Sequence, residues 1–154
     1  MNVQRPQGQH QDRNRGYGRD REPAAPLPKP ETVKSFIARD DTAADMVREA
    51  ESLGLRLQQN HVTTSQIRNA YGSMKKMEMA GWEGSKTLRQ LLLMKPRLAY
   101  AASRQKGVAD LKTVLSHAID AVAEAPEAER PDRFGRFCQF FEAILAYHKA
   151  AGGK

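Results

Sequence analysis

The sequence predicts an all-α fold, a single compact helical bundle of about five to six helices with a disordered N-terminal tail. From Glu31 onward, apolar residues recur at intervals of three and four, the period of a helix with one buried face. Residues that start and stop helices divide the chain, and no stretch alternates apolar and polar residues as a strand does. A length of 154 residues is typical of one domain.

Residues 1–30 form the predicted tail. They hold five of the eight prolines and repeated Gln, Arg and Gly, with almost nothing to bury. Such a segment cannot offset the entropy of ordering it. We therefore expect the helical domain to span residues 31–154.

The domain opens with a short helical turn and a longer helix. The apolar residues of the turn are Val33, Phe36 and Ile37. Thr42 is the predicted N-cap of the next helix, with Asp45 three residues later as an acidic variant of the capping box. Gly54 is a weak point within this helix because glycine disfavours helix interiors. The helix ends near Asn60.

The following helix, over about residues 64–80, has the clearest start. Thr63 caps it, Gln66 completes a capping box, and Val62 is placed to pack against Ile67. At about 100° per residue, one face of this helix is apolar. Another face is basic and carries Thr64, Arg68 and Lys75, with Lys76 at its edge.

Three more helical segments complete the chain. Ser85 is the predicted cap of a helix that Pro96 kinks or restarts, because proline lacks the backbone N–H. Residues 108–122 carry one apolar stripe. Asp132 is the predicted cap of the last helix, which carries all but one of the phenylalanines. Its wide apolar arc predicts the central helix of the bundle, ending at Gly152-Gly153.

The net charge of +7 is concentrated in one third of the chain. Residues 64–106 hold nine Lys and Arg against two Glu, while the remaining residues sum to zero. Such a concentration favours a polyanionic partner. Charge alone does not separate nucleic acid from an acidic protein or an anionic membrane surface, and a basic face that serves only solubility is the alternative.

No pattern typical of an enzyme occurs in the sequence. The four histidines have no partners at metal-ligand spacing, and no Gly-rich loop precedes a helix, so we predict no catalytic residue, metal or cofactor. On the last helix, we expect Cys138 to be a small core residue and His148 to be a packed or solvent-edge residue rather than a metal ligand. A single cysteine, a polar N-terminus and the lack of a long apolar run predict a cytoplasmic protein without a membrane span.

Basic residues at helical spacing are the main functional feature. The candidates for contacts to successive phosphates are Arg68, Lys75, Lys95, Arg97 and Arg104. Tyr71 and Tyr100 lie between them and offer rings for base stacking. Core packing with the hydroxyl at the edge is the favoured interpretation of both tyrosines.

Three segments occur in order along the chain: TTSQIR at 63–68, LMKPRLAYAA at 93–102 followed by Arg104, and FCQFFEAILAYHK at 137–149. In this order they resemble the small subunit of type III-A CRISPR–Cas effector complexes, the Csm complexes, over residues 42–153. The resemblance implies an all-helical, non-catalytic subunit of an antiviral complex. Several copies would stack beside the backbone subunits and the large subunit.

The resemblance also implies a partner and a set of contacts. The partner is the duplex of CRISPR RNA and target RNA, contacted mostly through the target-strand backbone. By position in the matching segments, Arg68, Arg97 and Arg104 are the implied contacts. Lys75 and Lys95 are further candidates because of the helix faces on which they are expected to lie.

Two other functions fit the residues. The segment Thr63–Met77 is compatible with a helix-turn-helix DNA-binding regulator, although it lacks the cluster of base-reading side chains that a recognition helix carries. A structural helical adaptor would use the basic face to dock an acidic protein.

Overall fold

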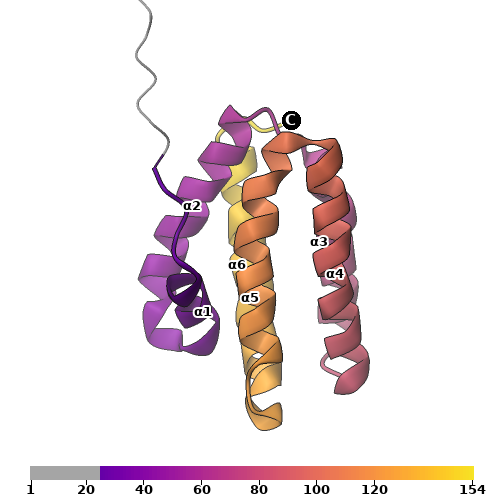
Figure 1. The fold of residues 1–154 in the computed structure, drawn as a ribbon. Coiled ribbons are helices and arrows are strands. Elements are labelled where there is room, and N and C mark those ends of the chain that lie inside the picture. Colours follow the sequence, from indigo (N-terminus) through magenta and orange to yellow (C-terminus); the bar gives the residue numbers. More distant parts are fainter. Residues whose placement is uncertain (1–24) are drawn as a thin grey trace, which may run out of the picture.

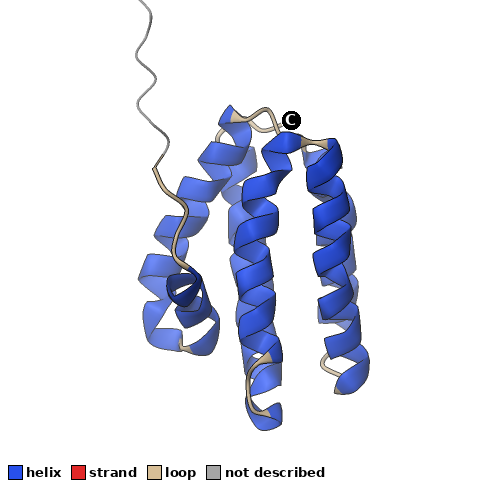
Figure 2. Ribbon diagram, viewed as in Figure 1, coloured by secondary structure: helices blue, strands red, loops and turns tan. Residues whose placement is uncertain are grey.

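The computed structural model describes residues 25–154 and folds them into an all-α bundle without strands in that range, as predicted (Figures 1 and 2). The six α-helices of this range are α1 (Pro30–Ala38), α2 (Ala43–Gln59), α3 (Thr64–Ala80), α4 (Ser85–Arg104), α5 (Ala109–Ala123) and α6 (Arg130–Ala150). Most of the predicted tail, residues 1–24, lies outside the described residues. Within the remainder of that segment, Leu27 packs against the core.

Helices α5 and α6 form the centre of the bundle. On one flank α1 packs against α5 and α2 against α6, and on the other flank α4 packs against α5 and α3 against α6 (Figure 1). The apolar arc of α6 is buried along most of its length, including Phe137, Phe140 and Phe141. The prediction that α6 is the central helix is confirmed.

Helices α2 and α6 lie very close together at Gly54. A Cβ atom added there would lie 2.7 Å from the backbone N of His148, 2.8 Å from Cβ of Tyr147 and 2.9 Å from the carbonyl oxygen of Ile144. Non-bonded carbon atoms prefer separations of about 3.5–4.0 Å. Gly54 is therefore the residue that lets the two backbones meet.

The predicted start of α3 is confirmed. The N–H of Thr63 donates to Oε1 of Gln66 at 3.0 Å, and the N–H of Gln66 donates to Oγ1 of Thr63 at 3.4 Å, which together make a capping box. Val62 and Ile67 are both buried in the core.

The predicted capping box of α2 is wrong. Thr42 does precede the helix, but its hydroxyl donates to the carbonyl oxygens of Ser35 and Arg39, each at 3.1 Å, and caps no helix N–H. Asp45 pairs with Arg48 instead. The Ser35 carbonyl belongs to α1 and the Arg39 carbonyl follows that helix, so the Thr42 hydroxyl turns back to the preceding segment and away from its own helix.

Two other predicted caps are also displaced. Gly84, with φ of 62°, precedes α4, so that Ser85 is the first helical residue and makes no cap hydrogen bond. Helix α6 begins before Asp132, because Pro131 fits in its first turn, where no intrahelical N–H bond is needed. Asp132 lies in that turn, where its negative charge interacts favourably with the positive end of the helix dipole.

Helix α4 continues through Pro96 and does not restart there. Pro96 and Leu92, whose carbonyl oxygen would accept the N–H that proline lacks, are both exposed. Water can satisfy an exposed carbonyl oxygen, which makes a proline on this side of the helix tolerable.

The end of the chain is tied to the start of α3. The N–H of Gly153 donates to the carbonyl oxygen of His148 at 2.9 Å, and the N–H of Thr64 donates to the backbone oxygen of Lys154 at 2.7 Å. The His148 ring is fully buried, with Nε2 2.6 Å from the carbonyl oxygen of Val62. Of the packed and solvent-edge positions expected for His148, the structure shows the packed one.

Candidate nucleic-acid interface

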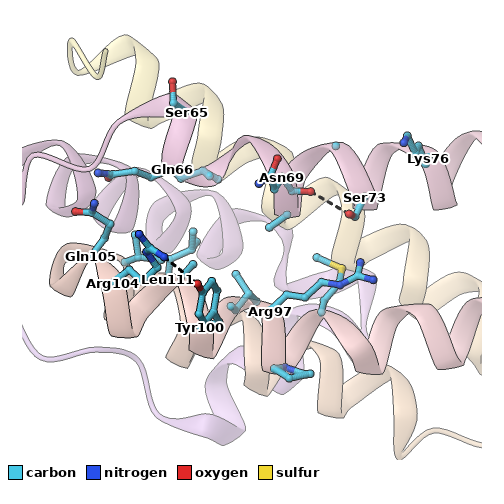
Figure 3. A pocket seen from close by; sticks show the side chains of 18 residues that line it. Ser65, Gln66, Asn69, Ser73, Lys76, Arg97, Tyr100, Arg104, Gln105 and Leu111 are labelled. Atoms are coloured by element: carbon cyan, nitrogen blue, oxygen red, sulfur yellow. Dashed lines mark hydrogen bonds between the residues drawn. The ribbon is translucent and has the colours of Figure 1, made fainter.

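Helices α3 and α4 enclose a groove of about 900 Å³ on their flank of the bundle (Figure 3). The buried apolar residues that line it are Ile67, Met94, Leu98, Val108 and Leu111. Its hydroxyl and amide side chains are Ser65, Gln66, Asn69, Ser73 and Gln105. Its cations are Lys76, Arg97 and Arg104. The groove therefore combines an apolar floor with a polar and positively charged rim.

Arg97 and Arg104 lie on the groove side of α4. Seven residues separate them, so their Cα atoms are about 10 Å apart along the helix. Both are exposed, and neither pairs with an acid among the described residues. Arg104 donates through Nη1 to the hydroxyl of Tyr100 at 2.8 Å (Figure 3). The sequence prediction that these two arginines share one side is confirmed by their common groove.

Lys76 lies across the groove on α3. A second hollow of about 310 Å³ between the same helices shares Ser73, Lys76 and Arg97 with the groove, so these residues lie where the two hollows meet. Helical spacing in the sequence places Lys76 only at the edge of the basic face. Its place in the groove depends on α4 lying beside α3.

Arg68 and Lys75 lie on another side of α3, outside the groove lining. Arg68 is exposed. Lys75 forms two ion pairs, with its Nζ 3.2 Å from Glu78 and 3.3 Å from Glu142 on α6. The hydrogen bond to Glu78 holds the pKa of Lys75 above its ordinary value.

Lys95 faces α5 and not the groove. Its Nζ lies 2.6 Å from Oδ1 of Asp120. Of the five predicted contact residues, the structure thus brings Arg97 and Arg104 into one groove. It places Arg68 and Lys75 on a neighbouring side of α3, and Lys95 on the side of α4 that meets α5.

The two tyrosines differ. Tyr71 stacks on Phe141 with ring centroids 5.6 Å apart and an interplanar angle of 18°, so core packing is confirmed for it. Tyr100 is 63% exposed and lines the groove, so core packing is wrong for this residue. The groove between α3 and α4 leaves the Tyr100 ring open to solvent, and this ring sits 5.7 Å from the Arg104 guanidinium.

The described residues contain no group of three or more side chains suited to a metal ion. Cys138 is buried in the core, as predicted, and burial raises the pKa of its thiol far above the ordinary value. No helix in the described part of the chain has the length and apolar character of a membrane span.

Comparison with known proteins gives one family. The family model Csm2 Type III-A matches residues 40–154, far more than half of the chain. No curated protein and no solved structure matches the chain. The helical bundle agrees with the fold that the sequence motifs implied. The protein therefore belongs to the Csm2 Type III-A family, the small subunits of type III-A CRISPR effector complexes.

Proposed function

We propose that this subunit is a non-catalytic RNA-binding component of its effector complex in the cytoplasm. Several copies stack beside the backbone and large subunits and contact the duplex of CRISPR RNA and target RNA in antiviral defence. The contacts are made to the phosphate backbone by basic residues of α3 and α4. They position the RNA without reading its sequence.

The observation that carries this proposal is the pairing state of the basic residues. Nine Lys and Arg lie between residues 64 and 106. Acids of the described residues pair with three of them: Lys75, Lys86 and Lys95. Six therefore keep their charge uncompensated on one flank of the bundle, Arg68, Arg97 and Arg104 among them. When unpaired cations of this kind neutralise phosphates, the counterions condensed on the nucleic acid are released, which favours binding.

Lys75 and Lys95 are expected to contribute less. Each must exchange a carboxylate partner for a phosphate before it contributes to binding. Both ion pairs are partly exposed to solvent, where water screens the attraction between the charges. The exchange is therefore inexpensive, and these lysines remain available to a nearby RNA strand.

Exposed apolar residues on opposite flanks support stacking. Val47 and Leu55 of α2 are 40% and 46% exposed, and Leu92 and Leu93 of α4 are 39% and 44% exposed. The two helices lie on opposite sides of the bundle (Figure 1). A contact between unlike faces repeats from copy to copy and does not close into a dimer.

The test compares arginine variants in the reconstituted effector complex. Arg97→Ala and Arg104→Ala should each lower the slope of log affinity for target RNA against log salt concentration by about one unit. Arg48→Ala on α2 removes the same charge from the opposite flank and should leave the slope unchanged. Identical slopes for all variants would show that this groove does not meet the RNA backbone.

The same material separates the other functions. A DNA-binding regulator would prefer one duplex DNA sequence over random duplexes. An adaptor would keep its partner subunits after nuclease treatment and show no affinity for RNA.

A further inference from the structure

The groove between α3 and α4 offers more than positive charge. A surface that only contacts phosphates needs cations and hydrogen-bond donors, yet this groove has a buried apolar floor that includes Met94 and Leu98. It also has an exposed aromatic ring, Tyr100, in its lining. These are the components of a site for a flat, partly apolar group attached to an anion.

We propose that the α3–α4 groove holds one unstacked base of a single-stranded RNA segment, with the neighbouring phosphates at Arg97 and Arg104. This inference rests on the proposed function and adds a base site to the backbone contacts. A base within a duplex is stacked and paired, so only its backbone would reach the groove. A base in a single strand is free to leave the stack.

Tyr100 supplies the stacking surface. Its ring is held by its own hydroxyl, which accepts a hydrogen bond from Arg104 at 2.8 Å. The arginine thereby fixes the ring beside a guanidinium that is placed to meet the phosphate of the same nucleotide. Stacking on an aromatic ring tolerates every base, because every base has a π-face.

Three amide side chains belong to the residues that line the groove. Asn69 and Gln105 make no side-chain hydrogen bond among the described residues, and each has both donors and acceptors to offer (Figure 3). Gln66 uses Oε1 in the capping box and keeps its amide N–H groups. An edge lined by amides can adapt to different bases, which suits a subunit that must accept many RNA sequences.

The volume agrees with such a ligand. Pockets for small molecules span about 300–1,000 Å³, and the groove measures about 900 Å³. Small residues leave this space open, since Ala70, Gly72 and Ser73 line it from α3 and Ala101 lines it from α4.

The experiment uses the full chain at low salt with two probes, a single-stranded RNA that carries 2-aminopurine and the same strand in a duplex. On binding the single strand, the wild-type protein should change the 2-aminopurine fluorescence. Tyr100→Leu should weaken single-strand binding about tenfold and abolish this change. Tyr100→Phe keeps the ring but loses the hydrogen bond from Arg104, so it should keep the fluorescence change and weaken single-strand binding less than Tyr100→Leu does. Duplex binding should change less than twofold in either variant.

A second pair of variants fills the groove without touching charge. Ala101→Leu occupies the space of the base and should reproduce the loss seen for Tyr100→Leu. Ala99→Leu makes the same change on an exposed position of α4 outside the groove lining and should behave as wild type. Thermal unfolding of each variant verifies that the bundle is intact.

Three outcomes would overturn the base site. They are equal loss of single-strand and duplex binding in Tyr100→Leu, an unchanged 2-aminopurine signal on wild-type binding, and no RNA binding by the full chain at low salt. The backbone function is decided separately by the salt slopes of the assembled complex. The base site can therefore fail while the proposed function stands.

Discussion

Replacing Gly54 by alanine tests how closely α2 and α6 approach. Without tertiary contacts, Gly→Ala inside a helix stabilises by about 1 kcal/mol, because alanine loses less backbone entropy. At Gly54 the new Cβ would meet three atoms of α6 at 2.7–2.9 Å, two of them backbone atoms. Backbone atoms of a central helix cannot rotate away as a side chain does, so the two helices must separate.

Overpacking of a filled core costs about 1–3 kcal/mol and occasionally more. Because the obstructing atoms belong largely to backbone, we expect the upper part of this range and a net destabilisation of about 2 kcal/mol after the gain in propensity. Gly135→Ala on α6 is the matched control, since its Cβ would have no atom within 4 Å. That variant should gain about 0.5–1 kcal/mol.

Urea unfolding followed by circular dichroism measures both changes. The free energies of unfolding of the two variants should differ by about 3 kcal/mol, with opposite signs relative to wild type. A Gly54→Ala protein as stable as the wild type would refute the close approach of α2 and α6. A Gly135→Ala protein no more stable than the wild type would refute the assumed gain in helix propensity.

Three further outcomes follow from named contacts. The Arg136 guanidinium holds the pKa of Asp40 below its ordinary value. The ion pair therefore stabilises the fold above about pH 4, and this stabilisation is lost as the pH falls further. In Asp40→Asn, the urea concentration at the unfolding midpoint should depend less on pH between about pH 4 and 2 than it does in the wild type. Burial raises the pKa of the Cys138 thiol, so iodoacetamide at pH 8 should alkylate it only in urea. In Gly153→Ala the new Cβ would lie 2.3–2.5 Å from the buried His148 ring, and the lost hydrogen bonds of the C-terminal turn should cost about 1–2 kcal/mol in urea unfolding.

Local spacing predicted the features whose partners lie within one helical turn. Thr63 and Gln66 satisfy each other across three residues, and the capping box follows from that spacing alone. The same rule failed at Thr42, where the hydroxyl donates back to the carbonyl oxygens of Arg39 and of Ser35 in α1. Residues 35 and 42 are brought together by the turn between α1 and α2, which a three-residue rule does not describe.

The sequence indicates which segment carries the cations of the candidate site, but not which of those cations lie in the groove. The charge count marks residues 64–106 as cationic, yet Lys95 meets Asp120 of α5 and Lys75 meets Glu142 of α6. These acids lie 25 and 67 residues further along the chain. Whether a cation is free for a partner is thus decided by the packing of other helices. The count of basic residues in one segment does not contain that information.

The groove itself results from the residues that face each other across α3 and α4. Helix α3 packs against α6 and α4 against α5, while small side chains such as Ala70 and Ala101 lie between them. Leucines at these two positions would fill the space and bury apolar surface, which generally stabilises a bundle. We therefore expect Ala70→Leu to raise the melting temperature and to weaken single-strand RNA binding in the same protein. A variant that gained stability and kept full RNA binding would show that the open groove has no part in recognition, because the space would then be a packing defect without function.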